Sequence, residues 1–404
     1  MAKPLLSLQD VQVRRGMGIV LDHCSVEVAS GQTVALTGAN GTGKSTLLEA
    51  AVGLLPLEQG RVLHHDTVVA DAEGRRRPSS LTVGTVLQKN GMLGGEMVGE
   101  HLHCAMAMSG STVDIEPFLR AFNLAHRAND MVAHLSQGQA RKVAVLAGLL
   151  PAFASSKPAL VLLDEPDAGL DDGSVEVLCR WLDQLRADGH AVLLATHDRR
   201  LVDRATHTMD ISDGPITSRQ PSSAPSTTDL QRTTAKPISR AAWGVKMHLR
   251  TMMWLNTNGM AGLLSLGVLL AMGSFMNGLD DMQQLGFILA PTMAVGLCGE
   301  PLVTALREER AAAWWRAVSG GEPHAGWLPF ALGMVMTAIS ATALQGAPSP
   351  ETLVVGSVLC GMVWHGVGWM QRSTQRLARP QAVFVGLLTP VLILPYSLLL
   401  SVLS

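Results

Sequence analysis

A glycine-rich segment near the N-terminus has the residue types needed to hold a phosphate chain. The segment follows the apolar run Gln32–Thr37, precedes the helical run Leu47–Leu54, and consists of Gly38, Ala39, Asn40, Gly41, Thr42, Gly43, Lys44, Ser45 and Thr46. Strand, loop and helix in this order are typical of a phosphate-binding loop, because backbone N–H groups can approach phosphate only where side chains are absent. In such a loop Lys44 would reach the β- and γ-phosphates, and the Ser45 hydroxyl would bind Mg²⁺.

Two carboxylates follow a second apolar run. Asp164 and Glu165 come directly after Val161–Leu163, which is continuously apolar, as expected of a parallel strand covered on both faces. Asp164 suits the Mg²⁺ shell, and Glu165 would polarise the water that attacks the γ-phosphate. Two acids at a strand end can also cap the next helix, but the phosphate loop upstream favours the catalytic interpretation.

With these motifs in this order, the first 215 residues resemble the nucleotide-binding domain of an ATP-binding cassette (ABC) transporter. The resemblance implies an α/β P-loop NTPase fold that binds ATP with Mg²⁺. It assigns Gln88 to Mg²⁺ and the membrane domain, Asp171 to the D-loop and His197 to sensing the γ-phosphate. The signature loop of the family is matched at all but its third position, where Gln137 replaces the usual Gly, by Leu135, Ser136, Gln137, Gly138 and Gln139.

The signature loop predicts a dimer. It opens a second helical run, Ala140–Leu149, and in this family it cannot reach its own phosphate loop. Each ATP lies instead between the phosphate loop of one domain and the signature loop of another. A homodimer would have two complete sites, and a heterodimer with a similar chain is the alternative.

One expected residue is missing from the nucleotide site. The family commonly stacks adenine on an aromatic side chain before the phosphate loop, whereas Val11–Val20 contains Arg14, Arg15 and Met17 and no aromatic residue. An arginine plane could replace the aromatic ring, with a stacking energy of roughly 0.5–2 kcal/mol. We therefore expect weak selectivity for the base.

Composition and charge distribution indicate a membrane protein. Of the 404 residues 47% are apolar and only 16% charged, and the formal net charge is −2, which excludes a disordered chain and does not favour nucleic acid as a partner. An α-helix needs about 20 residues to cross a bilayer. The second half has five uncharged runs near or above this length: Thr251–Leu279, Met282–Gly299, Pro323–Pro350, Thr352–Gln371 and Pro380–Ser404.

These runs predict an all-α transmembrane domain over residues 239–404. Its spans are expected near 255–277, 283–303, 326–346, 352–371 and 381–403, with a sixth crossing or re-entrant turn left open around Pro390 and Pro395. Residues 1–217 form the predicted nucleotide-binding domain and 218–238 a linker rich in Ser, Thr and Pro. Lys and Arg gather in alternate loops, and the start of the chain resembles no secretory signal. We therefore expect a protein of a bacterial cell membrane with its nucleotide-binding domain in the cytoplasm.

Three features of the membrane half leave alternatives open. Residues 307–322 are predicted to form an amphipathic helix with Glu308, Ala312 and Trp315 on one side, which would either press against the ATPase or anchor at the membrane surface. Glu300 either lines a transport path, or reaches the membrane interface or caps a helix broken at Pro301. His365 either exchanges a proton or ligates haem on such a path, or makes an ordinary hydrogen bond between helices.

The order of domains resembles that of exporter-type half-transporters. It implies ATP-driven export of a hydrophobic or amphipathic small molecule by a dimer embedded in the lipid bilayer. Two alternatives remain: handling of haem or lipid, or a membrane ATPase that acts without transport as a sensor, an immunity module or the driver of a partner protein. No motif in the membrane half identifies the substrate.

Overall fold

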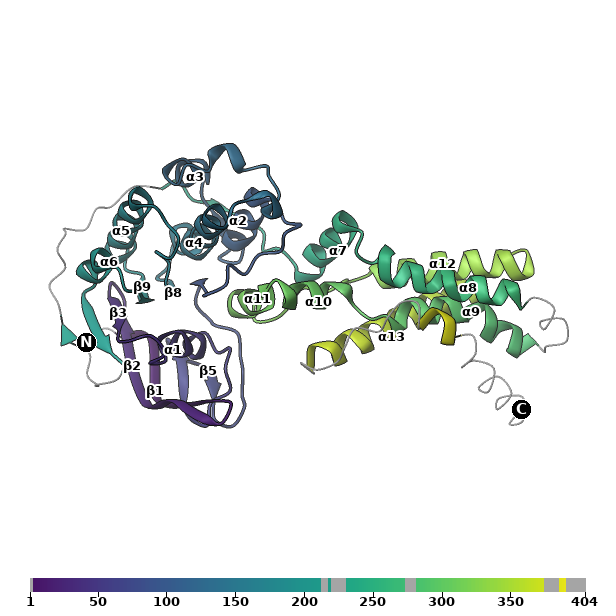
Figure 1. The fold of residues 1–404 in the computed structure, drawn as a ribbon, viewed down its shortest axis with the longest axis horizontal. Coiled ribbons are helices and arrows are strands. Elements are labelled where there is room, and N and C mark those ends of the chain that lie inside the picture. The colour runs from purple at the N-terminus through teal and green to yellow at the C-terminus, as the bar shows by residue number, and fades with distance from the viewer. Residues whose placement is uncertain (1–2, 212–216, 219–229, 273–280, 374–384, 390–404) are drawn as a thin grey trace. The chain divides into compact units, whose positions relative to one another are not determined.

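The computed structural model describes residues 3–211, 217–218, 230–272, 281–373 and 385–389, and these fall into two compact units. The first, which we call the α/β unit, comprises Met1–Ile238 and Glu309–Glu322. The second, the helical unit, comprises Ser239–Glu308 and Pro323–Ser404. Figure 1 shows the strands gathered in the first unit and only helices in the second.

Two larger sheets and the two-stranded pair β12-β7 form the described part of the α/β unit. An antiparallel sheet has the order β2-β1-β4-β5, and a larger sheet has the order β11-β10-β3-β9-β8-β6, in which β10, β3, β9, β8 and β6 run parallel. The strands are β1 Pro4–Arg15, β2 Gly18–Ala29, β3 Thr33–Thr37, β4 Gln59–His64, β5 Thr67–Asp71, β6 Val83–Val86, β7 Ser111–Thr112, β8 Leu160–Asp164, β9 Ala191–Ala195, β10 His207–Asp210, β11 Thr217–Ser218 and β12 Thr233–Thr234.

Helices cover the parallel sheet. In the α/β unit they are α1 Lys44–Ala51, α2 Val98–Ala107, α3 Glu116–Ala121, α4 Gln137–Ala154, α5 Asp172–Ala187, α6 Arg199–Arg204 and α11 Ala311–Ser319. Every residue of β8 and β9 is buried, as expected for parallel strands packed on both faces. The α/β P-loop fold predicted from the sequence is therefore confirmed.

Helix α4 packs unusually close to strand β6. A Cβ atom on Gly84 would lie 1.9 Å from the carbonyl oxygen of Gly148, and a Cβ atom on Gly148 would lie 2.5 Å from Cγ2 of Val86. Glycine at both positions lets the helix backbone rest directly on the strand. This contact sets the position of the helix that begins at the signature loop.

The helical unit is built from α7 Arg240–Thr251, a π-helical turn Leu255–Gly259, α8 Met260–Ala271, α9 Asp281–Leu297, α10 Pro301–Glu308, α12 Leu328–Gln345 and α13 Pro350–Ser373. Within the described residues, Gln283–Glu308 and Pro350–Ser373 are long and apolar enough to cross a membrane. Arg240–Thr251 with Leu255–Ala271 would be a third span, bent by 65°, and Leu328–Leu344 is a shorter apolar helix. The predicted fifth span, 381–403, lies outside the described residues except for 385–389, so the number of five stays a prediction.

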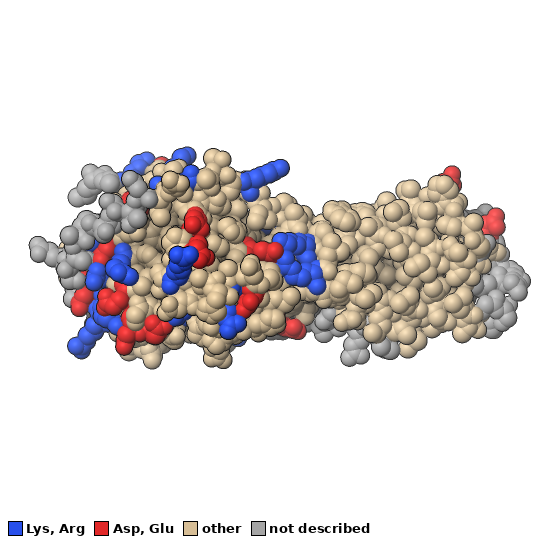
Figure 2. All heavy atoms as spheres, turned by 90° about the horizontal axis from the view of Figure 1, so that it is seen from above, with Lys and Arg blue, Asp and Glu red and all other residues tan. Residues whose placement is uncertain are grey.

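The surface of the helical unit suits a lipid environment. Only 28% of the apolar window of α13 is buried, and Val354, Met362 and Trp369 are each more than 60% exposed. On the face shown in Figure 2, charged side chains are scattered over the α/β unit, whereas the surface of the helical bundle is almost entirely uncharged. The C-terminal helices therefore fit a membrane domain.

Two local expectations differ from the structure. Residues 307–322 are not one helix: α10 ends at Glu308, α11 begins at Ala311, and Arg310 between them has a φ of 56°. Glu308 and Ala312 therefore do not share a helix face. Within the predicted linker, Thr233–Thr234 forms a short strand paired antiparallel with β7. Residues 219–229 lie outside the described part.

The contact between α4 and β6 gives a stability prediction. Gly84→Ala should lower the free energy of unfolding of the α/β unit by about 3 kcal/mol or more, because the helix must move away from the strand. Thermal unfolding of the detergent-solubilised protein, followed by intrinsic fluorescence, measures the loss. Gly18→Ala is the matched control, since nothing lies within 4 Å of its added Cβ; equal melting temperatures for the two variants would contradict the prediction.

Candidate nucleotide-binding site

The predicted functional residues gather at one edge of the parallel sheet. Strands β3, β9, β8 and β6 are neighbours in this sheet, and the phosphate loop, His197, Glu165 and Gln88 follow their respective C-terminal ends. Parallel strands place their carboxyl ends on the same side, where ligands of open α/β sheets bind. The register pairs Asp164 with Ala195, so the segments leaving β8 and β9 start side by side.

The phosphate loop has the backbone conformation that requires glycine. Gly38, Gly41 and Gly43 have φ values of 127°, 85° and 104°, in the range that residues with a side chain rarely adopt. The Lys44 ammonium donates to the carbonyl oxygens of Gly38 at 2.8 Å and Ala39 at 2.9 Å, so its positive charge is held at the loop. Helix α1 begins at Lys44 and directs its free N–H groups to the same place.

A cleft of about 510 Å³ opens in front of this loop. It is lined by Arg15, Val20, Asn40, Gly41, Gly43, Lys44, Ser45, Thr46, Glu49, Gln88 and Glu165. The cleft thus brings together the loop, Gln88 and Glu165, which the sequence places far apart. Gly38, Ala39 and Thr42 belong to the same loop without lining the cleft.

Three oxygen-bearing side chains fit a magnesium ion. The Ser45 hydroxyl donates to Asp164 Oδ1 at 3.0 Å, and Gln88 faces the cleft that Ser45 lines. Hydroxyl, carboxylate and amide oxygens are the ligands that Mg²⁺ prefers. Burial raises the pKa of the Asp164 carboxyl to about 6, while the Ser45 hydrogen bond opposes the shift. A bound cation would favour the ionised carboxylate at this position.

Glu165 and His197 follow the neighbouring strands β8 and β9, and of the two only Glu165 lines the cleft. Glu165 lines the cleft with a φ of 46°, and its N–H donates to Ala195 O at 2.9 Å. His197 is exposed, two residues beyond the end of β9. Thr196 beside it donates to Asp167 Oδ1 at 2.7 Å, which ties the two strand exits together.

The signature loop forms the N-terminal cap of α4. Ser136 Oγ accepts from Gln139 N–H at 3.3 Å, and Gln139 Oε1 accepts from Ser136 N–H at 3.0 Å, which is a complete capping box. Gln137 at the departure from the family pattern is exposed, and Gly138 is partly exposed. None of these four described residues lines the cleft of its own chain.

Asp171 has a structural partner that the sequence did not indicate. It caps α5 by accepting from Ser174 N–H at 2.9 Å, and Lys142 of α4 approaches its second oxygen at 2.5 Å. The hydrogen bond from Lys142 lowers the pKa of Asp171 to about 2. The D-loop is therefore tied to the helix of the signature loop.

Arg141 is a second residue whose contacts the sequence did not indicate. It is 6% exposed and donates to backbone carbonyls beside both Gln88 and Glu165. A usable signal exists in the sequence: Arg141 is a charged residue inside the apolar helical run Ala140–Leu149, where a long cation needs buried acceptors.

Arg15 is the arginine before the phosphate loop that lines the cleft. It lines the cleft and forms an ion pair with Glu49 of α1, whereas Arg14 is directed to Glu58 at 3.6 Å and does not line the cleft. Met17 is 97% exposed at the turn between β1 and β2. Of Arg14, Arg15 and Met17, only Arg15 lines the cleft, so base stacking by Arg15 stays a prediction.

Comparison with known proteins agrees with this geometry. Residues 21–168 match the profile of the family described as ABC transporter. The chain is 31% identical over 225 residues to HrtA of Staphylococcus aureus, an ATP-binding protein named for hemin import; the match covers 52% of this chain and 99% of HrtA. The chain belongs to the ABC transporter family.

Two further similarities show how much of this chain and of its relatives the matches cover. The match to the macrolide export ATP-binding/permease protein MacB of Hyphomonas neptunium is 28% identical over 272 residues, covering 62% of this chain and 41% of MacB. This ABC transporter therefore spans less than half the length of that relative. A solved ATP-binding subunit of an ABC transporter is 26% identical with a TM-score of 0.44, covering 51% of this chain and 85% of its own.

The two candidate path residues in the membrane half of this ABC transporter have different hydrogen-bond partners. Glu300 is fully buried at the break between α9 and α10, where it accepts from Arg372 at 2.7 Å. His365 Nε2 on α13 donates to Gly326 O at 2.9 Å, in the turn that precedes α12. Pro301 opens α10, as the alternative of a helix broken at this residue requires. A path role for either residue stays a prediction.

The position of Arg15 predicts how the site holds the base. Arg15→Ala should raise the KM for ATP by about 2- to 30-fold, the equivalent of the 0.5–2 kcal/mol of cation–π stacking, and the KM for GTP by a similar factor. Arg15→Tyr should restore ATP affinity. Steady-state ATPase and GTPase assays give these values, with Arg14→Ala as the matched control; an unchanged KM for Arg15→Ala would remove the stacking role.

Proposed function

We propose that this chain is a half-transporter that dimerises, binds two Mg-ATP between its α/β units, and uses hydrolysis to export a hydrophobic or amphipathic compound. The observation that carries the proposal is the composition of the cleft, where phosphate loop, magnesium ligands and Glu165 meet while the signature loop of the same chain stays outside. ABC ATPase domains hydrolyse ATP to power transport, and this chain carries one.

The chemistry follows from the side chains at the cleft. The glycine loop and the N-terminus of α1 offer N–H groups to the phosphates, and Lys44 adds a positive charge against the β- and γ-phosphates. Ser45, Gln88 and Asp164 would hold Mg²⁺, which neutralises charge on the phosphate oxygens. Glu165 would orient and polarise the attacking water, and His197 would contact the γ-phosphate.

Dimerisation supplies the part of the site that one chain lacks. ABC cassettes work as dimers, and the capped N-terminus of α4 presents Ser136, Gln137 and Gly138 at the surface. Free N–H groups at a helix N-terminus attract an anion such as the γ-phosphate. Because each chain has both halves of the site, we favour a homodimer with two complete sites.

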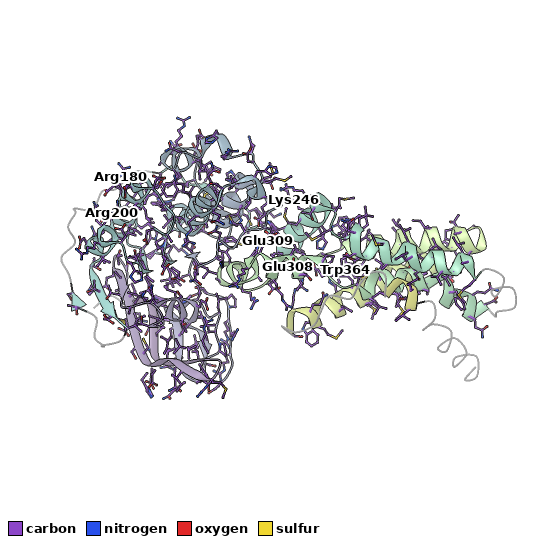
Figure 3. All side chains as sticks on the ribbon, viewed as in Figure 1. Arg180, Arg200, Lys246, Glu308, Glu309 and Trp364 are labelled. Atoms are coloured by element: carbon purple, nitrogen blue, oxygen red, sulfur yellow. The ribbon has the colours of Figure 1, made fainter. Side chains whose placement is uncertain are left out.

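Helix α11 is the part of the membrane half that would transmit movement. Its Trp314 is 2% exposed and stacks on the His101 ring of α2 at 4.8 Å. A Cβ atom on Gly91, three residues after Gln88, would lie 2.7 Å from Cβ of Trp314. The Glu309 carboxylate, which is labelled in Figure 3, accepts a hydrogen bond from Gly94 N–H at 2.5 Å. These contacts support the first of the two sequence interpretations, in which the segment presses against the ATPase.

The direction of transport and the substrate class are inferred from the helical unit. Exposed apolar side chains on helices such as α13 favour a compound that enters from the lipid phase. The similarity to HrtA covers 52% of the chain, matching the extent of the ATPase region, and ATPase regions carry no substrate path. Hemin handling therefore gains no support for the helical unit from that similarity.

Replacing the catalytic carboxylate tests the ATPase and the dimer together. Glu165→Gln should retain ATP binding but lose at least 99% of hydrolysis, about a hundredfold or more for a general base, and the trapped ATP should hold the protein as a dimer. ATPase assays and light scattering after size exclusion, with and without Mg-ATP, measure both effects. Glu176→Gln on α5, an exposed carboxylate outside the cleft, is the matched control.

A monomeric Glu165→Gln protein in Mg-ATP would contradict the dimer. Full hydrolysis by Lys44→Ala would contradict the assignment of the phosphate loop. Neither result depends on knowing the transported compound.

The packing of Trp314 gives a prediction about transport. Trp314→Ala should leave the ATPase within about twofold of wild type but reduce ATP-dependent ethidium movement in proteoliposomes by about tenfold, because the contact beside the Gln88 segment is lost. Trp327→Ala, 61% exposed, is the control. An equal loss of hydrolysis and transport in Trp314→Ala would show a structural defect and contradict the prediction. If the wild-type protein moves no ethidium, dyes of this class are excluded as substrates.

A further inference from the structure

The strongest unassigned feature of the α/β unit is the hydrogen bonding of Arg141. Its Nη1 donates to the carbonyl oxygen of Leu87 at 2.9 Å and to Asn90 Oδ1 at 3.4 Å. Its Nη2 donates to the carbonyl oxygens of Asp164 and Glu165, both at 2.7 Å. One side chain from α4 thus contacts the segment that carries Gln88 and the segment that carries Glu165.

Only a guanidinium can make this set of contacts. Its planar fork presents two nitrogens to two separate segments at once, whereas a lysine ammonium is a single point donor. The cation is 6% exposed, and a buried charge is tolerated where acceptors and opposite charges surround it. The carboxylates of Asp164, Glu165 and Asp167 provide that opposite charge.

The Glu165 backbone needs such support. Its φ of 46° lies in the left-handed region, which is unfavourable for a residue with a side chain. The N–H of Glu165 is fixed by Ala195 O at 2.9 Å, and its carbonyl oxygen is fixed by Arg141. The direction of the Glu165 side chain into the cleft therefore depends on a contact from α4.

We propose that Arg141 is a positioning residue that couples the two ATP sites of the dimer. The proposal rests on the dimer of the proposed function, in which the signature loop of each chain binds the γ-phosphate held by its partner. Helix α4 starts at that loop with Ser136 and Gln139 locked in a capping box, and Arg141 follows five residues later.

The distance between the two ends of this link is short. Five residues of α-helix span about 7.5 Å, so movement at the signature loop reaches Arg141 within the first two turns of one rigid element. Arg141 then transfers this movement to the backbone at Leu87 and Glu165, because it donates hydrogen bonds to their carbonyl oxygens. Occupation of the partner's site thereby sets the positions of Gln88 and Glu165 in this chain's own site.

The test is the ATP dependence of hydrolysis by the full-length protein in lipid nanodiscs. With two coupled sites the wild-type Hill coefficient should lie clearly above 1 and at most near 2. Arg141→Gln should bring it to about 1 and lower kcat about tenfold or more, while the dissociation constant for ATP, measured by equilibrium binding in EDTA, changes less than about threefold. A merely structural role would lower the yield or kcat and leave the Hill coefficient unchanged.

Two more variants keep the test decisive. Arg141→Lys retains the charge with one donor nitrogen and should give an intermediate Hill coefficient, even where Arg141→Gln fails to fold. Arg180→Gln, an exposed arginine on α5 labelled in Figure 3, is the matched control and should behave as wild type.

The outcomes separate this inference from the proposed function. A wild-type Hill coefficient of about 1, or a wild-type value in both Arg141 variants, overturns the coupling role. If Glu165→Gln forms the ATP-dependent dimer in the same preparation, that result leaves the half-transporter proposal intact. If Glu165→Gln stays monomeric, the proposed function itself fails.

Discussion

The burial of the parallel sheet on both faces is the constraint on which the α/β unit depends. Strands β8 and β9 have no exposed residue, so polar side chains can follow them only at their ends. Parallel strands bring those ends to one edge, and the phosphate loop, Gln88, Glu165 and His197 meet there for this reason. Because Gly84 and Gly148 let α4 pack close to β6, the N-terminal turns of α4 and their positively charged side chains lie beside the same edge. The chemistry of the site is thus a consequence of how the apolar strands are covered.

Residues inside the α/β unit were predictable where the sequence pattern is local. The run Gln32–Thr37 and the loop after it correspond to β3 and α1 with small changes of boundary, because glycine spacing and an apolar strand are sufficient signals. The roles of Arg141 and Lys142 were not predictable, since their acceptors are Leu87, Glu165 and Asp171, up to 54 residues away. A buried arginine can be suspected from a helical pattern, but its partners are set by tertiary packing.

Tertiary packing also decides where residues 307–322 lie, and the sequence pattern alone does not reveal it. For residues 307–322, which include Trp314 and Trp315, the sequence leaves a membrane-surface anchor open, and aromatic residues beside a span usually lie at the lipid headgroups. Both are buried instead: Trp314 packs on His101 of the α/β unit, and the two indoles are perpendicular at 5.4 Å. The break at Arg310, with its left-handed backbone, separates α11 from α10, and helical periodicity alone cannot reveal such a break. Composition correctly indicated an amphipathic segment but could not decide which apolar surface it covers.

Buried charged side chains have different kinds of partner in the two units. This difference bears on which residues could select a transported compound. In the α/β unit, buried ions such as Arg141 and Asp164 contact backbone and nucleotide-site groups that are fixed by the strands. In the helical unit, Glu300 is fully buried at a helix break and its charge is offset by Arg372 of α13. A carboxylate in such surroundings is costly unless its partner stays in place, so the Glu300–Arg372 pair restricts how α13 can move against the break. If the proposed export is correct, the apolar helices around this pair, whose side chains differ mainly in shape, would contribute to selectivity for the compound.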